Sequence, residues 1–226
     1  MSDKWAEVMA SHSGYPLLWG PTDVDRFILD PKRIAFFMAR YKFAAKMLRD
    51  CTSIIDVGCG SGMGTLTFLQ DTKAKHVRGV DFEQRVIDHA NNELMPAVRN
   101  LRTDGEKLTF DCGDFSKMVW PELFDGLACL DVIEHVEPEK SGEFIVRLAR
   151  SMTRNGVAVI GTPSLASAEY GSEFSKLGHI NLYDADRLRE ELGGHFRHVF
   201  MFSMNDEYVG TQFDKLAHYY MALCIK

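Results

Sequence analysis

The sequence has no apolar run long enough to span a membrane, and its first residues lack the apolar core of a secretory signal peptide. Proline is scarce, with 7 in 226 residues, which excludes a proline-rich or collagen-like chain. An excess of positive charge is also missing, because 26 basic residues face 32 acidic ones and the formal net charge is −6. These absences predict a cytoplasmic protein and argue against a broad electrostatic grip on nucleic acid.

Cysteine is sparse, and no pair has the C-x-x-C spacing of a redox or zinc motif. Because the cysteines are odd in number and irregularly spaced, the sequence predicts reduced thiols and no disulfide framework. With 226 residues, 46% of them apolar, the chain is long enough to fold around its own core. We therefore predict a single domain over residues 1–226, while the sequence gives no indication of oligomeric state. The five cysteines are Cys51, Cys59, Cys112, Cys129 and Cys224.

Short apolar runs rich in β-branched residues alternate with segments of helical spacing. Such alternation is typical of an α/β fold with a mostly parallel sheet and helices on both faces. No strong helix signal separates the last two runs, so we predict a seven-stranded sheet with an antiparallel C-terminal edge strand. The predicted strands are Thr52–Val57, Val77–Val80, Leu108–Cys112, Phe124–Leu130, Val157–Thr162, His198–Met204 and Tyr219–Ile225.

Two segments outside this alternation are predicted to flank an active site. Residues 1–50 form a helical cap or lid, with a helix over Pro31–Leu48 whose apolar stripe faces the core and whose basic residues, Arg40 among them, face solvent. Residues 163–183, rich in serine, glycine and alanine, form an active-site loop. The aromatic residues of the cap either wall an acceptor site or, as is more common, dock the cap on the core; they are Trp5, Tyr15, Trp19 and Phe27.

The segment Ile54–Thr65, IIDVGCGSGMGT, is a strand followed by a glycine-rich turn and a helical run. Glycines in such a turn let the backbone bend tightly and let a ligand lie against it. A nicotinamide-dinucleotide fingerprint needs a glycine at position 63, where this chain has Met63. Asp56, just ahead of the turn, would repel a pyrophosphate, so a cationic ligand suits this loop better.

Acidic residues follow the next two predicted strands. Asp81 lies 21 residues after Gly60, where an acid in this fold accepts hydrogen bonds from a ribose diol. Asp114 follows the third strand, and its carboxylate is placed to accept from an adenine amino group while Phe115 packs against the ring. Because the carboxyl ends of parallel strands meet at one crevice, we expect the glycine loop and both acids to converge there.

These residues, with the later segment FDGLACLDVIEHV, resemble class I S-adenosylmethionine-dependent methyltransferases in order and spacing from about Ile54 to Thr162. The resemblance implies a Rossmann-like fold, S-adenosylmethionine as cofactor and methyl transfer as activity. It places the glycine loop against the methionine and ribose, Asp81 on the ribose hydroxyls and Asp114 on the adenine. The cofactor-binding residues we predict are Asp56, Gly58, Cys59, Gly60, Gly62, Asp81, Phe82, Gly113, Asp114, Phe115, Leu130 and Asp131.

The motif DVIEH, Asp131 to His135, is similar to ubiquinone-biosynthesis O-methyltransferases and to small-RNA 3′-end 2′-O-methyltransferases. In members of both groups the matching acids and histidine hold a divalent metal, and some supply a second histidine at the place of His179. A helical turn here would put Asp131, Glu134 and His135 on one face. The resemblance implies catalytic roles for Glu134, His135 and His179. It also implies a mixed oxygen and nitrogen metal site of Asp131, Glu134, His135 and His179, in which Asp131 reaches less far than the usual glutamate.

Four functions remain open at this point. The favoured one is methyl transfer to a small hydroxylated acceptor, such as a phenol, a sugar or a secondary-metabolite intermediate, with His135 as base or metal ligand. The second is a small-RNA 2′-O-methyltransferase, which the net charge of −6 opposes. A nicotinamide-dependent oxidoreductase is third and is opposed by Met63 in the glycine turn. The fourth is a cofactor-binding protein without catalytic activity.

Overall fold

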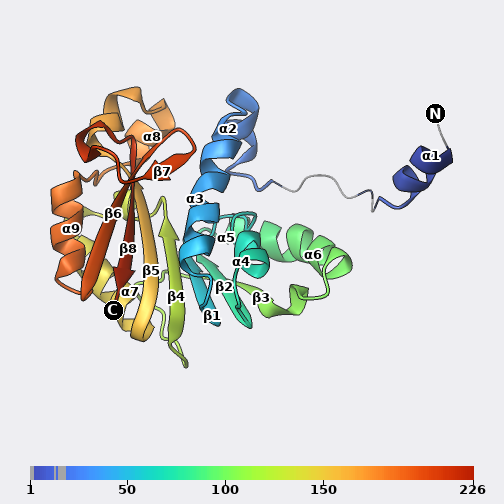
Figure 1. The fold of residues 1–226 in the computed structure, drawn as a ribbon, viewed down its shortest axis with the longest axis horizontal. Helices are drawn as coiled ribbons and strands as arrows, with labels where there is room; N and C mark the ends of the chain where they lie inside the picture. The colour runs from blue at the N-terminus through green and yellow to red at the C-terminus, as the bar shows by residue number, and fades with distance from the viewer. Residues whose placement is uncertain (1–2, 13, 15–18) are drawn as a thin grey trace.

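The structure is a computed structural model that describes residues 3–12, 14 and 19–226. Its centre is an eight-stranded sheet in the order β3-β2-β1-β4-β5-β8-β6-β7 (Figure 1). The strands are β1 (Ser53–Val57), β2 (His76–Asp81), β3 (Leu108–Cys112), β4 (Phe124–Leu130), β5 (Met152–Pro163), β6 (His198–Asn205), β7 (Tyr208–Gly210) and β8 (Tyr219–Ile225).

The first five strands pair in parallel, and β8 runs antiparallel to both β5 and β6. This confirms the predicted α/β class, with a mostly parallel sheet and an antiparallel C-terminal part. The structure adds the short strand β7, which pairs with β6 and forms the edge, so that β8 lies inside the sheet. Parallel strands buried on both faces need continuous apolar runs, as Leu127 to Leu130 illustrate.

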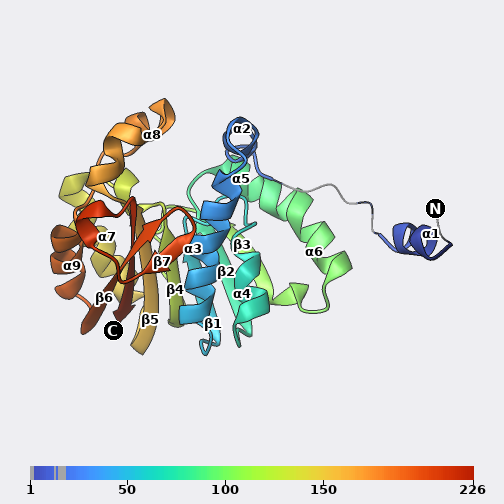
Figure 2. The same ribbon diagram turned by 45° about the horizontal axis from the view of Figure 1, so that its top comes forward.

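Helices cover both faces of the sheet (Figure 2). On one face an apolar cluster joins the sheet to the helices that precede and follow β1 and β2, with Tyr41, Phe68 and Val98 among its members. These helices are α3 (Arg33–Met47), α4 (Leu66–Asp71), α5 (Gln84–His89), the π-helix η1 (Ala90–Leu94) and α6 (Met95–Leu101). A second cluster, which includes Phe144 and Leu188, packs the opposite face against α7 (Pro138–Arg150) and α9 (Ala185–Gly193).

Helix α3 confirms the predicted helix but begins at Arg33 rather than at Pro31. The chain first makes a turn in which the Arg33 amide donates to the Asp30 carbonyl, so Pro31 lies in that turn and not at the first helical position. The predicted stripe is buried where it meets the sheet, at Tyr41, Ala45 and Leu48.

Shorter helices stand above the carboxyl ends of the parallel strands, where α2 (Val24–Leu29) and α8 (Glu173–Gly178) appear in both views (Figures 1 and 2). The segment 163–183 therefore contains two helices, since α8 follows the 3₁₀-helix η4 (Leu165–Tyr170), and the hydroxyls of Ser164 and Ser172 cap them. The remaining elements are α1 (Asp3–Ala10), η2 (Gly105–Lys107), η3 (Ile133–His135) and η5 (Asp214–Leu216). Within the described residues, no helix has the length and apolar character that a membrane crossing requires.

Candidate active site

The loop between β1 and α4 turns through three glycines with positive φ, namely Gly58 at 76°, Gly60 at 53° and Gly62 at 86°. Residues with a side chain rarely adopt this conformation. Space also demands glycine at position 58, because a Cβ there would lie 2.1 Å from Cγ2 of Val132. The predicted glycine turn therefore has the conformation that lets a ligand approach the backbone closely.

Asp81 links this turn to the end of β2. The Gly60 amide donates to its Oδ2 at 2.9 Å, and the Glu83 amide donates to its Oδ1 at 3.0 Å. Each carboxylate oxygen has a further lone pair, so both can still accept from the hydroxyls of a diol. The neighbouring Phe82 is 76% exposed, and its ring is available to flank a ligand held by Asp81.

The Gly113–Asp114 turn lies beside the same place, because the Gly113 amide donates to the Asp81 carbonyl at 2.9 Å. The Asp114 carboxylate accepts from the Ser116 amide at 3.0 Å and pairs with the Lys117 ammonium at 2.8 Å. The hydrogen bond from Lys117 is the main reason why the pKa of Asp114 is lowered. Asp114 is thus a charged acceptor at the edge of the predicted crevice.

Phe115 is predicted to pack against an adenine ring, and in the structure its ring is buried. It is 6% exposed, and its ring packs in the core between Trp120 and Phe144, with centroid distances of 6.1 Å to each. Any contact that Phe115 makes with a cofactor in this conformation is through its backbone.

Asp56 and Cys59 lie beneath the glycine turn and are both buried. The Thr65 hydroxyl donates to Oδ2 of Asp56 at 2.6 Å, which ties the end of β1 to the start of α4. Among the described residues, Oδ1 of Asp56 has no hydrogen-bond partner. Burial raises the pKa of Asp56 to about 7 and also raises that of the Cys59 thiol, so Cys59 has no feature of a reactive thiolate.

The end of β4 brings Leu130 and Asp131 to the other side of the turn. Leu130 is buried, whereas Asp131 leaves the strand with a φ of 58°. Nη1 of Arg40 donates to both carboxylate oxygens of Asp131 at 2.7 Å, and the Arg40 guanidinium lies 3.9 Å from the ring centroid of Tyr219. The predicted exposure of Arg40 to solvent is therefore wrong, because only 22% of its side chain is exposed.

Glu134 is fully buried, which is unusual for a carboxyl group. The Thr162 hydroxyl donates to its Oε2 at 3.0 Å, while Oε1 has no hydrogen-bond partner in the part of the chain that the structure describes. Burial, helped by the nearby charge of Asp131, raises the pKa of Glu134 to about 8. Perturbed carboxyl groups of this kind are concentrated at functional sites.

His135 ends the 3₁₀-helix η3, and its exposed ring faces the segment after α8. Nδ1 of His135 lies 2.8 Å from the Gly178 carbonyl. A carbonyl only accepts, so Nδ1 carries a proton, and in the neutral form of the ring the lone pair is on Nε2. The ring of His179 lies at a centroid distance of 5.1 Å, which brings both predicted histidines together.

Three of the four predicted metal ligands are close enough to share one ion. Ligand atoms of Glu134, His135 and His179 all lie within 4.8 Å of one another, and the unpartnered Oε1 of Glu134 is a suitable donor. Asp131 is not in this group, since Arg40 holds both of its oxygens and the single short turn of η3 does not put the three motif side chains on one helical face. The donor set that fits a divalent cation is therefore one carboxylate and two imidazoles.

The N-terminal aromatic residues mostly dock the cap on the core. Trp19, Phe27 and Phe37 pack edge to face with one another, at centroid distances of 4.5 to 6.2 Å. The same segment rests on the glycine turn, because the Ser61 hydroxyl donates to Asp23 at 2.9 Å. Trp5 is half exposed on α1, and Tyr15 lies outside the described residues.

Comparison with known proteins agrees with this geometry. Residues 54–156 match a family model described as a methyltransferase domain. The sheet order and the glycine turn agree with this match, so residues 54–156, slightly less than half of the chain, are similar to a methyltransferase domain.

The chain is similar to proteins named ubiquinone biosynthesis O-methyltransferase. It is 28% identical to that of Rickettsia conorii over 127 residues, which cover 55% of this chain and 40% of the relative. It is 29% identical to that of Rickettsia canadensis over 109 residues, which cover 48% of this chain and 42% of the relative. The matches thus span about two fifths of the length of these relatives.

Solved structures share the fold at low sequence identity. The methyltransferase domain of bacterial CtHen1-C superposes with a TM-score of 0.68 at 15% identity, covering 83% of this chain and 97% of that one. The N-methyltransferase NodS of Bradyrhizobium japonicum, in complex with S-adenosylhomocysteine, gives a TM-score of 0.58 at 14% identity and covers 99% of this chain and 97% of that one. These likenesses support the fold and do not distinguish between acceptors.

Proposed function

We propose that this protein transfers the methyl group of S-adenosylmethionine to an oxygen atom of a small hydroxylated acceptor, with His135 as the general base. The observation that carries this proposal is the hydrogen bond between Nδ1 of His135 and the Gly178 carbonyl. It fixes the ring tautomer and leaves Nε2 able to take a proton. His135 lies five residues after the end of β4, the strand end that is predicted to flank the methionine part of the cofactor.

Methyl transfer from a sulfonium is an in-line displacement with a good leaving group. The protein has two tasks, which are to align the acceptor oxygen with the methyl carbon and to accept the acceptor's proton. Alignment can account for about 7–11 kcal/mol of the barrier. A phenol has a pKa of about 10, near that of tyrosine, so a neutral histidine is an adequate base for it.

We assign cofactor binding to the residues that surround the glycine turn. The backbone of Gly58, Gly60 and Gly62 lines one wall, Asp81 receives the ribose hydroxyls and Asp114 receives the adenine amino group. Arg40 and Asp131 form an ion pair at the opposite wall, at 2.7 Å. Sequence reasoning overlooked Arg40 as a residue of this wall.

A divalent cation is a second candidate for activating the acceptor. Glu134, His135 and His179 would hold it, and their convergence within 4.8 Å supports this alternative. When bound, the cation would act as a Lewis acid on the acceptor oxygen, which a weakly acidic sugar hydroxyl needs more than a phenol does. Treatment with a chelator distinguishes the two mechanisms. If activity is lost and added Mn²⁺ or Mg²⁺ restores it, the cation rather than His135 as a base activates the acceptor.

The acceptor is best sought with a panel of phenols, catechols and methyl pyranosides. Each is incubated with the protein and S-adenosylmethionine that carries a deuterated methyl group, and products are analysed by mass spectrometry. We expect a labelled methyl ether from at least one member of the panel. Transfer to amines but to no hydroxyl would contradict O-methylation, and retention on RNA that falls steeply with added salt would favour the nucleic-acid alternative.

A further inference from the structure

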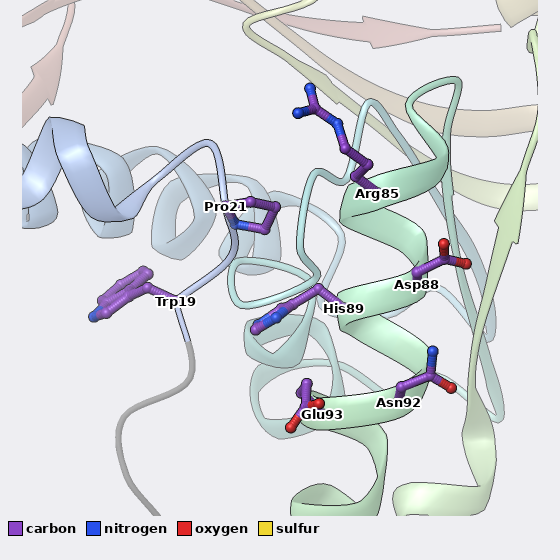
Figure 3. Close-up of a pocket in the computed structure, with 7 residues that line it drawn as sticks. All are labelled: Trp19, Pro21, Arg85, Asp88, His89, Asn92 and Glu93. Atoms are coloured by element: carbon purple, nitrogen blue, oxygen red, sulfur yellow. The ribbon is translucent and has the colours of Figure 1, made fainter.

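A groove of about 440 Å³ lies between Trp19 and Pro21 on one side and helix α5 with its continuation η1 on the other (Figure 3). This volume is within the range of small-molecule sites. None of its lining residues belongs to the glycine turn or to the DVIEH motif. Its polar and aromatic lining comes from Trp19, Arg85, Asp88, His89, Asn92 and Glu93.

The helical side of the groove carries polar groups on successive turns. Arg85, His89 and Glu93 recur at a spacing of four residues, as do Asp88 and Asn92. After His89 the chain continues as a π-helix over Ala90–Leu94, a form that is rare and frequent at functional sites. Figure 3 shows the His89 ring and the Glu93 side chain extending toward the Trp19 segment.

One group in this lining lacks a partner. Nε2 of His89 is buried and has no hydrogen-bond partner among residues 3–12, 14 and 19–226. Buried polar atoms are nearly always hydrogen-bonded in folded proteins, so a ligand that supplies this bond would be favoured. Two other groups are held in place by neighbours, since Glu83 accepts from Arg85 at 2.8 Å and Asp88 accepts from Gln84 at 2.7 Å.

The chemistry of the lining selects among ligand classes. Arg85 only donates, the carboxylates of Asp88 and Glu93 only accept, and the amide of Asn92 does both. A phosphate would need donors alone, and the two carboxylates would repel it. An organic cation would need acceptors alone, and Arg85 would repel it. A hydroxyl both donates and accepts, so a ligand with several hydroxyls can bond to donors and acceptors of this lining alike.

We propose that this groove binds a polyhydroxylated ring of the pyranose type, with its C–H face on the indole of Trp19 and its hydroxyls on His89 and Glu93. The apolar face of such a ring matches an aromatic surface, and its rim carries hydroxyls in several directions. The site is separate from the groups assigned to methyl transfer. It does not rest on the proposed function.

The test is saturation-transfer NMR on the protein with methyl glucoside, galactoside, mannoside and rhamnoside as probes. Choline serves as the cationic probe, and inorganic phosphate, followed by phosphorus line broadening, as the anionic one. We expect at least one pyranoside to bind and Trp19→Leu and Glu93→Ala each to weaken it about tenfold or more. Glu93 is exposed, so its variant should fold normally, and Glu106→Gln, at an exposed carboxylate that does not line the groove, is the control.

Saturating S-adenosylhomocysteine should leave pyranoside binding unchanged, because the groove lies outside the predicted cofactor residues. The proposal is overturned if no pyranoside binds, if choline or phosphate binds in its place, or if Trp19→Leu and Glu93→Ala bind like Glu106→Gln. Displacement of the sugar by S-adenosylhomocysteine would also overturn it, since the probe would then occupy the cofactor crevice. These outcomes do not depend on whether methyl transfer is observed.

Discussion

The two walls of the crevice are built in different ways. The wall from β1 and β2 consists of backbone in a conformation that only glycine adopts easily, with acids fixed by amide donors, as at Gly60 and Asp81. The opposite wall consists of side chains from distant parts of the chain, such as Arg40 and Asp131, which are 91 residues apart. The methyltransferase model begins at residue 54, after Arg40, and ends at 156, before His179. The first wall lies within the matched range, whereas Arg40 and His179 lie outside it, and we propose that acceptor choice is made at the second wall.

The largest expected effect is on the rate of methyl transfer and comes from a change in the second wall. Replacing His135 by alanine removes the proposed base, and general-base contributions are typically about 10²–10⁴-fold, so we expect methyl transfer to fall by that factor. Affinity for S-adenosylhomocysteine should stay within about twofold, as measured by calorimetry. His195→Ala, at an exposed histidine after α9, is the matched control. Unchanged transfer by the His135 variant would remove this residue from the mechanism.

In the first wall, adding a side chain at a glycine should strain the backbone and lower the stability of the fold. At Gly58, alanine would have to adopt a φ of 76° and place its Cβ 2.1 Å from Val132, which we expect to cost about 2–4 kcal/mol of unfolding free energy. Urea denaturation measures this loss. Gly142→Ala is the control, because a Cβ there meets nothing within 4 Å inside helix α7, and it should be neutral or slightly stabilising. Equal stability of the two variants would show that the turn tolerates a side chain.

A substitution at Asp81 tests ligand binding at the first wall. Hydrogen bonds to a charged group contribute about 1.5–3 kcal/mol, so Asp81→Ala should weaken S-adenosylhomocysteine binding by roughly 10- to 150-fold. The exposed Asp186→Asn should bind like the parent protein. If both variants bind equally well, the ribose contact assigned to Asp81 is incorrect.

The last expected effect concerns pH. Burial raises the pKa of Asp56 to about 7 from an ordinary value of 3.8, so the folded state holds a proton that the unfolded state has released over that range. Stability from this group is therefore complete below about pH 4 and is lost as the pH rises toward 7 and above. Asp56→Asn should lose less stability than the parent between pH 5 and pH 8 in urea titrations. Parallel profiles would mean that Asp56 is ionised throughout.

The difference between the walls also explains what the sequence could predict. Buried runs such as Ile54 to Val57, and a glycine turn directly after them, are local signals, and they located the sheet and the predicted cofactor residues. Arg40 lies three residues after Phe37 and four before Ala44, on the helix face that packs inward, and this spacing was a usable signal. Its partner Asp131 could not be found in this way, because only the fold brings the two together.

Short elements also limited what could be predicted from the sequence. Strand β7 has three residues, too few for an alternating pattern, although Asp206 and Glu207 between β6 and β7 make a two-residue hairpin turn with Asp206 at a φ of 49°. The ring of Phe115 was expected at an adenine because it follows Asp114, yet it packs against Trp120 and Phe144 in the core. Adjacency in sequence does not decide which of two neighbouring side chains faces the crevice.

The central claim is that the glycine turn and Asp81 form a site for S-adenosylmethionine. Thermal unfolding of the purified protein with S-adenosylhomocysteine, with NAD and without ligand tests it most directly. At 100 times its Kd a ligand adds about 2.7 kcal/mol, so we predict a clear rise in Tm with S-adenosylhomocysteine, none with NAD, and a smaller rise for Asp81→Ala. A rise with NAD alone, or no rise with S-adenosylhomocysteine, would contradict the account.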